Sequence, residues 1–238
     1  EIVVMSATLA PERLRAWLGE AQVLRSEGRL YPVEIRYRPP DPRRSPAPPV
    51  WEQAAEAWAE WVRTGGEGVA LVFMPGFWEI RRTIEAILNR PESRGWAVLP
   101  LHGDLAPEQQ DEAVAPGGGR RVIVATNVAE TSITIEGVRL VVDSGLARIA
   151  RYDPYRGLDT LLVERISRAA ADQRAGRAGR TGPGLCVRLW SERDHWARPA
   201  EETPELLRVD LSEIALALKA AGVRDLRAFR WLDAPSPG

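Results

Sequence analysis

The sequence predicts an α/β protein in which helices cover both faces of a parallel β-sheet. Short runs of mostly apolar residues recur along the chain, and the clearest are residues 69–74, 97–101, 122–126 and 140–143. A strand that is apolar at consecutive positions is buried on both faces, which is typical of parallel sheets. Stretches with helical periodicity separate these runs, and strands that alternate with helices form a sheet of this kind.

The composition is that of an ordinary globular protein. Of 238 residues, 45% are hydrophobic and 27% are charged, which suffices for one domain of usual size with appendages. The formal net charge is −1, so attraction to a polyanion must come from a local basic cluster. The single cysteine, Cys186, excludes an intrachain disulfide and fits a reducing compartment. With only two histidines beside it, the sequence predicts no metal site.

The sequence predicts neither export nor membrane insertion. No basic segment followed by an apolar one opens the chain, and no apolar run reaches about 18 residues. We therefore expect a cytoplasmic protein without a membrane partner. Because the chain starts at Glu1, directly inside an apolar run, we also expect it to be a segment of a longer protein.

The first fifty residues predict two strands, a helix and a linker. The apolar run of residues 2–5 indicates a strand, and Pro11 lies in the first turn of the helix that follows. Residues 33–37 alternate between apolar and polar positions, as a strand does. The proline-rich residues 39–49 indicate an exposed linker, because proline lacks a backbone donor and fixes φ.

A helix rich in tryptophan is expected next. Its apolar face contains Trp51, Ala54, Ala55, Trp58, Trp61 and Val62. Aromatic residues at this spacing could stack on nucleic-acid bases, but helical periodicity favours packing against the core. Pro75 and Gly76 then end the strand at residues 69–74, and a second helix is expected at residues 77–88.

The last third of the chain predicts a β-hairpin, a strand and a helix. Apolar and β-branched runs at residues 147–152 and 158–165 flank the segment DPYRG, whose proline and glycine are typical of a hairpin loop. A strand is expected at residues 185–190. From about residue 205, a run of apolar residues predicts a helix, and Gly222 would end it. The apolar residues are Leu206, Leu207, Val209, Leu211, Ile214, Leu216 and Leu218.

Packing alone does not explain residues 173–180, whose sequence is QRAGRAGR. Arg174, Arg177 and Arg180 recur every three residues, which on a helix places them on neighbouring turns. The glycines between them cost roughly 1 kcal/mol each in a helix interior, so we expect something to approach the backbone closely. Permanently charged guanidinium groups suit a polyanion such as a nucleoside triphosphate, although a solvated basic helix end gives the same pattern.

With two further motifs, this segment resembles the second half of the helicase core of DEAH-type RNA helicases, most closely the bacterial HrpB-type branch. Residues 173–180 are similar to motif VI of that family, residues 6–8 (SAT) to motif III, and residues 125–137 (ATNVAETSITIEG) to motif V. Three motifs in the right order are more specific than any one of them. The resemblance extends over the whole chain.

The resemblance implies a RecA-like fold and three parts of the chain. Residues 1–25 would be a remnant of a first RecA-like domain, with the motif III strand and helix. Residues 26–203 would form the second RecA-like domain, from which the β-hairpin projects beside the nucleic acid. Residues 204–238 would begin a helical winged-helix region.

The resemblance also implies a set of residues that act on the nucleotide. Arg177 and Arg180 would be arginine fingers, because fixed cations stabilise the charge of a transferring phosphoryl group. Gln173 would hold the γ-phosphate or its attacking water. Ser132 would sense the γ-phosphate, and Glu136 beside Gly137 would lie near the ribose.

Val114 marks a departure from the family pattern. Many DEAH proteins place an aromatic residue against the nucleotide base at the position that matches Val114. Valine cannot stack as an aromatic ring does, so we expect ATP and other nucleoside triphosphates to be accepted.

The RNA contacts are expected mainly where strands end, because functional residues of α/β sheets lie at the carboxyl ends of strands, where Gly76, Gly103, Thr126 and Asp143 fall. Thr126 and Asn127 could donate to RNA phosphates or simply cap the next helix. Arg174 would make salt bridges or contact the RNA strand, and His102 would lie near RNA or serve the loop structure. The predicted RNA-binding residues are Gly76, His102, Gly103, Thr126, Asn127, Thr134 and Arg174.

The sequence contains no phosphate loop of the form GxxxxGK[ST] and no DEAH string. We therefore expect the chain alone to be inactive, with the first RecA-like domain as its partner in cis and the ligands of Mg²⁺ outside this chain. The residues Ser6, Ala7 and Thr8 would couple hydrolysis to domain movement. The intact enzyme would use ATP to translocate on RNA and unwind it; the alternatives are a non-catalytic nucleic-acid-binding module and a DNA-directed translocase of the same superfamily.

Overall fold

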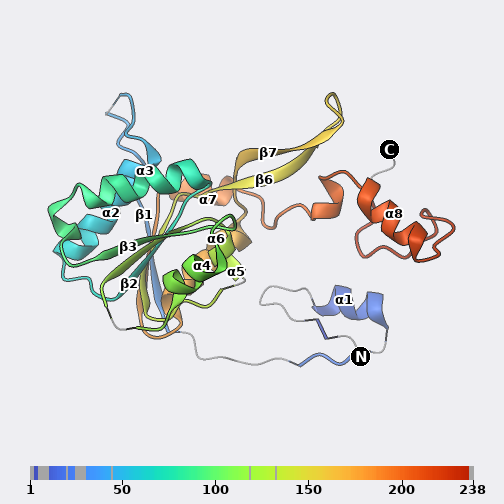
Figure 1. Cartoon of the computed structure of the whole chain (residues 1–238), viewed down its shortest axis with the longest axis horizontal. Helices are drawn as coiled ribbons and strands as arrows, with labels where there is room; N and C mark the ends of the chain where they lie inside the picture. Colours follow the sequence, from blue (N-terminus) through green and yellow to red (C-terminus); the bar gives the residue numbers. More distant parts are fainter. Residues whose placement is uncertain are drawn as a thin grey trace. The chain divides into compact units, whose positions relative to one another are not determined.

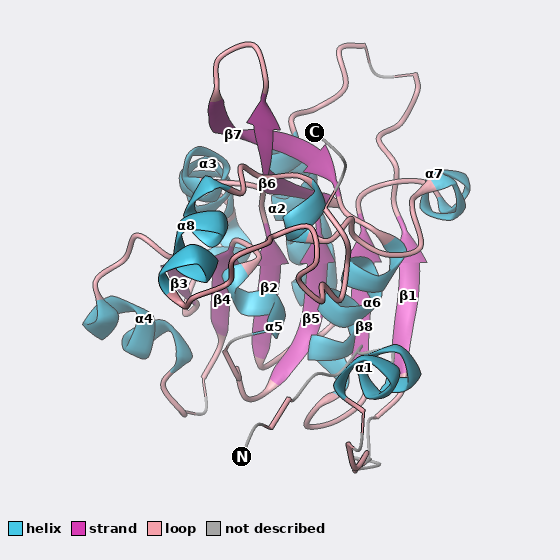
Figure 2. Ribbon diagram, turned by 90° about the vertical axis from the view of Figure 1, so that its right-hand side faces the viewer, coloured by secondary structure: helices cyan, strands magenta, loops and turns pink. Residues whose placement is uncertain are grey.

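A six-stranded sheet organises the larger of the two units of the chain (Figure 1). All its neighbouring strands are parallel, and their order is β1-β8-β5-β2-β4-β3 (Figure 2). The strands are β1 (Val33–Tyr37), β2 (Val69–Phe73), β3 (Ala97–Leu101), β4 (Arg121–Ala125), β5 (Val138–Asp143) and β8 (Gly184–Arg188). The predicted α/β class and each predicted inner strand are confirmed.

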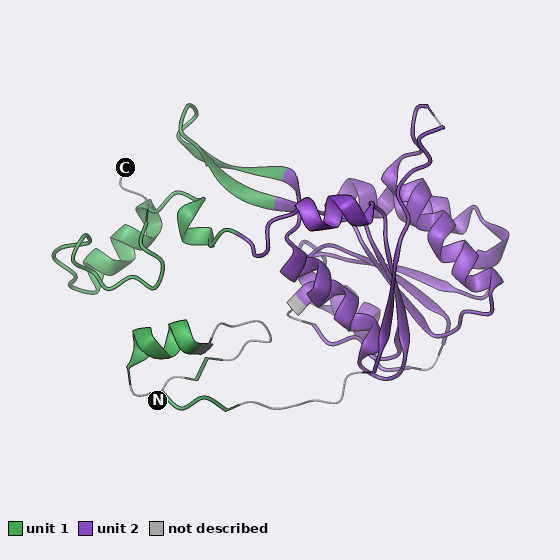
Figure 3. Cartoon of the chain, turned by 180° about the vertical axis from the view of Figure 1, so that it is seen from behind, with its two compact units in different colours: residues 1–28, 149–162, 203–238 green, residues 29–148, 163–202 purple. Residues whose placement is uncertain are grey.

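The computed structural model describes residues 3–4, 11–19, 21–24, 31–43, 45–117, 119–131 and 133–235. The larger unit contains residues 29–148 and 163–202, and the smaller one contains residues 1–28, 149–162 and 203–238 (Figure 3). None of the helices within the described ranges is both long and apolar enough to cross a membrane.

Helices α2 (Val50–Arg63) and α3 (Phe77–Leu88) cover one face of the sheet. The buried ring of Trp58 packs at the centre of this layer, with its centroid 5.5 Å from that of Trp96 in an edge-to-face arrangement. Ala54 and Ala55 are also fully buried, while Trp51, Trp61 and Val62 pack against the cluster from its rim. The tryptophan-rich face is therefore core, as its periodicity indicated. The short 3₁₀ helix η1 (Pro91–Ser93) follows α3.

Helices α4 (Pro107–Val114), α5 (Val128–Thr131) and α6 (Arg168–Gly176) cover the other face, with the 3₁₀ helix η2 (Arg177–Gly179). Ser167 caps α6, because its hydroxyl accepts from the Ala170 backbone N–H at 3.1 Å. The predicted single arginine helix thus ends at Gly176 and continues as a 3₁₀ turn. In the arginine segment, Arg174 bonds Asp143 at the end of β5. Gly179 lies near the start of β1, because its carbonyl accepts from the Tyr31 N–H at 2.8 Å.

Strands β6 (Leu146–Asp153) and β7 (Leu158–Arg165) form a separate two-stranded sheet, so the predicted hairpin is confirmed. At its tip the Asp153 carboxylate accepts from the backbone N–H groups of Tyr155 and Arg156, at 2.9 and 3.3 Å. Gly157 has φ of +67°, a left-handed conformation that favours glycine. The Tyr155 side chain is 99% exposed.

The C-terminal helix differs from its prediction. A 3₁₀ turn, η3 (Glu205–Leu207), stands where the helix was expected to begin, and α8 (Ser212–Ala220) starts later. The break has a local cause, because the Asp210 carboxylate accepts from the Ser212 N–H at 2.7 Å, which favours a turn there. Gly222, with φ of +88°, follows the helix as predicted. Helix α7 (Glu192–Ala197) follows β8 in the chain.

At the N-terminus, α1 (Pro11–Leu18) begins at the predicted proline. Of the strand predicted before it, only Val3 and Val4 are described, and neither is in a strand. The motif III residues Ser6, Ala7 and Thr8 lie outside the described residues.

We expect Trp58→Ala to lower the free energy of unfolding by about 3–5 kcal/mol, because it leaves a cavity in the core. Trp196→Ala is the matched control, since the Trp196 side chain is 64% exposed, and it should cost less than about 1 kcal/mol. Denaturant unfolding measures both values. Equal losses would show that the α2 layer does not stabilise the fold as described.

Candidate functional site

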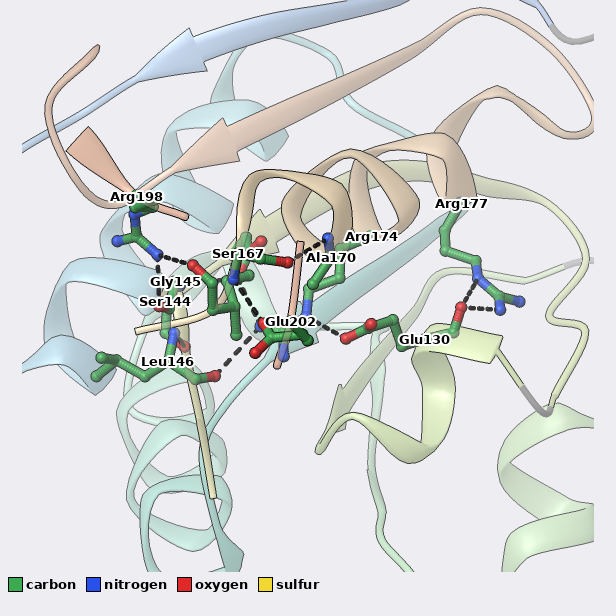
Figure 4. Close-up of polar contacts among 12 residues, drawn as sticks. Glu130, Ser144, Gly145, Leu146, Ser167, Ala170, Arg174, Arg177, Arg198 and Glu202 are labelled. Carbon is green, nitrogen blue, oxygen red and sulfur yellow. Dashed lines mark hydrogen bonds and ion pairs between the residues drawn. The ribbon is translucent and has the colours of Figure 1, made fainter. Parts of the chain in front are cut away.

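Arg174 is at the centre of a buried ion-pair network (Figure 4). Its Nε donates to Glu130 Oε2 at 2.9 Å, and its Nη1 donates to Asp143 Oδ1 at 2.9 Å and to the Leu146 carbonyl at 3.2 Å. The guanidinium carbon lies 4.8 Å from the centroid of the Phe73 ring. One side chain of α6 therefore fastens that helix to α5, to the end of β5 and to the start of β6.

Burial shapes the protonation of this network. Loss of solvent raises the pKa of Glu130, and the charge of Arg174 only partly opposes that rise. Burial also lowers the pKa of Arg174, but the charges of Asp143 and Glu130 outweigh this and raise it overall. Asp143 and Arg174 are both completely buried. The guanidinium consequently stays charged and is neutralised from within the protein.

This burial bears on two expectations. The salt bridges predicted for Arg174 are present, but the RNA contact is not retained, because its guanidinium has no exposed surface to offer a phosphate. Asp143, expected at a functional strand end, instead serves as an internal partner. Its Oδ1 also accepts from the Gly145 N–H at 2.8 Å.

Arg177 holds the backbone of the segment that follows α5. Its Nε donates to the Glu130 carbonyl at 3.0 Å, its Nη2 bonds the same oxygen, and its Nη1 donates to the Ile133 carbonyl at 2.5 Å. These acceptors are neutral. Burial, with the nearby charge of Arg180, lowers the pKa of Arg177 to about 10. The group still carries its charge at neutral pH.

Arg180 is exposed and donates from Nη1 to the Thr134 hydroxyl at 3.3 Å. In the described part of the chain, neither Arg177 nor Arg180 forms an ion pair with a carboxylate. Two neighbouring guanidinium groups thus lack a carboxylate within ion-pair distance in the described residues, and the charge of Glu130 offsets that of Arg177 only in part. Gln173 lies on α6 one turn before Arg177, and it is half-buried. This arrangement is suited to binding a multiply charged anion.

The two glycines of the arginine segment have different surroundings. A Cβ on Gly179 would lie 2.6 Å from the Tyr31 carbonyl oxygen, so the close approach predicted there comes from the protein's own backbone. A Cβ on Gly176 would meet nothing within 4 Å. Only the first glycine is therefore explained by internal packing.

The segment that resembles motif V leaves β4 and forms α5. The carbonyls of Thr126 and Asn127 accept from the N–H groups of Ala129 and Glu130, at 3.3 and 2.9 Å, which starts the helix through backbone bonds. Asn127 is exposed and Thr126 is half-buried. Ser132 lies outside the described residues.

The remaining residues predicted near the nucleotide occupy different places. Glu136 is exposed on the segment that ends at the turn before β5. Gly137 forms that turn with φ of +74°, and its carbonyl accepts from the Val69 N–H at 3.1 Å. Val114, the last residue of α4, is half-buried and packs against the core of that face.

A second group of residues gathers at the carboxyl ends of β2 and β3. Gly76 precedes α3, and a Cβ there would lie 2.6 Å from Nε of Arg148. His102 follows β3, with its ring 5.2 Å from that of Phe77. The residue is 6% exposed, and neither ring nitrogen has a hydrogen-bond partner among the described residues, although Nδ1 lies 3.8 Å from Asp104 Oδ2. Gly103 beside it has open space around its Cα.

Sequence reasoning missed Arg148 because no motif contains it. It lies in β6, and only the fold brings its guanidinium against the glycine before α3. The N-terminus of α3 carries a partial positive charge, so Arg148 adds to an existing preference for anions.

Comparison with known proteins identifies the family. Residues 54–182 match the family described as "Helicase conserved C-terminal domain". The chain belongs to this family. It is 40% identical over 240 residues to the ATP-dependent RNA helicase HrpA of Escherichia coli, with 99% of this chain and 18% of that protein covered.

The ATP-dependent RNA helicase HrpB of E. coli is 43% identical over 238 residues, with 99% of this chain and 29% of that protein covered. A crystal structure of the E. coli DEAH/RHA helicase HrpB superposes with a TM-score of 0.87 at 42% identity, covering 98% of this chain and 29% of that chain. The resemblance and the RecA-like fold are thus confirmed. This helicase C-terminal domain spans 18–29% of the length of these two relatives.

We expect Arg174→Met to lower the free energy of unfolding by about 3–5 kcal/mol, because it leaves the Asp143 carboxylate buried without its cation. Arg82→Met is the control, since Arg82 pairs with Glu85 on the surface, where both side chains are about half exposed, and its loss should cost at most about 1 kcal/mol. Urea unfolding of both variants measures the difference. A cost for Arg174→Met as small as for the control would mean that the network does not stabilise the domain.

Proposed function

We propose that this chain is the second RecA-like domain of an ATP-dependent RNA helicase, and that Arg177 and Arg180 face the polyphosphate of the nucleotide. The observation that carries the proposal is the pair of neighbouring guanidinium groups without a carboxylate partner in the described residues. The relatives that cover the whole chain are named ATP-dependent RNA helicases, which supports the same nucleotide.

The roles within this site follow from exposure and partners, because Arg177 is buried and Arg180 is exposed. Arg180 is exposed, so it can swing from the Thr134 hydroxyl to a γ-phosphate oxygen and act as an arginine finger. Arg177 is tied to two carbonyls; it adds positive charge and holds the segment after α5. Gln173 orients the γ-phosphate or the attacking water, and Ser132 senses the γ-phosphate. When bound, the nucleotide with Mg²⁺ supplies the transferable phosphoryl group.

The base and ribose are contacted by other residues. Val114 provides apolar contact for the base, and the exposed Glu136 beside Gly137 offers a carboxylate acceptor to the ribose. Thr134 is exposed and its hydroxyl accepts from Arg180, so the predicted RNA contact of Thr134 would lie next to the nucleotide site.

RNA is proposed to cross the carboxyl ends of the strands. Gly76 and Arg148 at the N-terminus of α3 would hold one phosphate, with His102 and Gly103 beside them. Thr126 and Asn127, before α5, would hold a second phosphate. His102 and the open space around Gly103 lie directly after β3, which supports this position.

The domain assignment belongs to the same proposal. Residues 26–203 form the second RecA-like domain, residues 1–25 carry motif III of the first, and residues 204–238 begin a winged-helix region. The first domain would supply the phosphate loop and the Mg²⁺ ligands, and Ser6, Ala7 and Thr8 would couple hydrolysis to domain movement. The β6–β7 hairpin, with Tyr155 exposed at its tip, would contact a base at the strand junction. The enzyme would work in the cytoplasm.

In the full-length enzyme, Arg180→Ala should lower RNA-stimulated ATP turnover roughly 10³-fold, the effect typical of an arginine finger. RNA affinity without nucleotide and the melting temperature should stay unchanged, because the side chain is exposed. Arg168→Ala, at the other end of α6, is the control and should retain turnover. Loss of RNA binding with turnover preserved would refute the assignment.

Arg148→Gln should weaken binding of RNA to a similar degree for every sequence. It should also reduce the magnitude of the slope of log affinity against log salt concentration by about one. Titration of a fluorescent oligonucleotide at several salt concentrations measures both effects. Arg120→Gln, in a surface pair with Glu67, is the control. The same titration with DNA tests the alternative of a DNA-directed translocase, which tighter binding of DNA would favour.

Val114 leads to a prediction about selectivity. The full-length enzyme should turn over ATP, GTP and CTP at similar rates, because valine offers no stacking ring and no base-edge donor. Val114→Phe should raise the apparent affinity for purine over pyrimidine nucleotides several-fold. A strong preference of the unaltered enzyme for ATP would mean that another residue recognises adenine.

A further inference from the structure

One buried guanidinium holds both ends of the β6–β7 hairpin (Figure 4). Arg198 Nη1 donates to the Gly145 carbonyl, immediately before β6, at 2.8 Å, and to the Ile166 carbonyl, immediately after β7, at 3.2 Å. The guanidinium carbon lies 4.1 Å from the centroid of the Trp190 ring, and only 3% of the side chain is exposed. Arg198 belongs to none of the three helicase motifs.

Asp194 completes this clamp. Its Oδ2 accepts from Arg198 Nη2 at 3.0 Å, while its Oδ1 accepts from Nη1 of Arg165, the last residue of β7, at 2.7 Å. The Ile166 N–H donates to the Gly145 carbonyl at 3.1 Å, which closes the base of the hairpin. Arg198 and Asp194 therefore tie both strands of the hairpin, β6 and β7, to helix α7 and its C-cap residue.

The position before β6 is shaped for this contact. Gly145 has φ of +71°, and a Cβ there would lie 2.6 Å from the Trp190 ring and 2.7 Å from Nη2 of Arg198. A residue other than glycine would be strained and would push the guanidinium away. The backbone is thus fitted closely around Arg198.

The same stretch of backbone is held from its other side by motif VI. Asp143 Oδ1 accepts from the Gly145 N–H, and Arg174 Nη1 bonds both Asp143 and the Leu146 carbonyl. Residues 143–146 thus lie between Arg174 of α6 and Arg198. A shift of α6 would move the backbone at which β6 begins, and Arg198 would carry β7 with it.

We propose that Arg198 is a positioning residue that couples nucleotide hydrolysis to movement of the hairpin, with Asp194 orienting its guanidinium. The inference rests on the proposed function, in which Arg177 and Arg180 respond to the nucleotide and the hairpin contacts a nucleic-acid strand. The planar guanidinium presents donors to Gly145, Ile166 and Asp194 at once, and a lysine ammonium matches this geometry only in part.

The test compares Arg198→Gln with the unaltered full-length enzyme. RNA-stimulated ATP turnover should stay within about twofold, while the rate of duplex unwinding under the same conditions should fall roughly tenfold, within the range known for coupling residues. Arg198→Lys should restore part of the unwinding. Asp194→Asn is a milder variant, because it leaves the bonds of Arg198 to both carbonyls in place, and it should show the same split to a smaller degree.

Arg188→Gln is the matched control. The Arg188 side chain is 3% exposed, like that of Arg198, and its guanidinium carbon lies 5.8 Å from the centroid of the same Trp190 ring, but it bonds Asp172 and Tyr37 and makes no bond to the hairpin in the described residues. Arg188→Gln should lower the free energy of unfolding without changing the ratio of the unwinding rate to the rate of ATP turnover. If Arg198→Gln lowers turnover and unwinding equally, as a general loss of folding would, the proposal is overturned.

Hydrogen exchange separates this inference from the proposed function. In Arg198→Gln the Ile166 amide should exchange at least tenfold faster, while the amides of β5 should keep their protection. This readout does not depend on unwinding. An enzyme that shows this change but never unwinds RNA would refute the proposed function alone, whereas unchanged exchange at Ile166 would refute the clamp.

Discussion

The ion pairs of Arg174 are the interaction on which the rest of this domain depends. Moving three charges out of water costs several kcal/mol for each ion, and only close partners offset that cost. Here one arginine meets two carboxylates, from α5 and from the end of β5. Asp143 Oδ2 and Arg174 Nη2 have no partner among the described residues, which makes the existing bonds still more important. The bonds of Arg174 consequently join motif V, motif VI and the base of the hairpin.

The partners of the arginines divide a single motif between two tasks, since Arg174 and Arg177 are both buried. Arg174 is neutralised by internal carboxylates, so its charge is not available to a ligand. Among the described residues, the hydrogen bonds of Arg177 and Arg180 go to carbonyl and hydroxyl oxygens, and the nearby charge of Glu130 offsets that of Arg177 only in part. The lowered pKa of Arg177 reflects the same imbalance, because burial and a neighbouring positive charge both disfavour its protonated form. An anion bound there would relieve that repulsion, which links the electrostatics of the site to the proposed ligand.

Much of this could be predicted from local sequence. Continuous apolar runs such as that of β2, buried at all five positions, predicted the inner strands, and the spacing of Trp58 with its neighbours predicted a packed helix. Both patterns depend on only one requirement, that apolar side chains leave water. The predicted start of the helix at residue 205 was wrong, because the Asp210 carboxylate accepts from the Ser212 N–H and so competes with helical bonding.

The sequence by itself determined the fold class, the order of the elements and the family, because periodicity and motif spacing are properties of neighbouring residues. Tertiary structure alone decided which arginines are buried, why Gly179 must be glycine, and that Arg148 lies against Gly76 and Arg198 against Gly145. Arg198 meets a carbonyl 53 positions away, and Arg174 meets Glu130 at a separation of 44. Contacts between residues so far apart in the sequence depend on how strands and helices are brought together in space. The residues between the two partners do not indicate which residues pair.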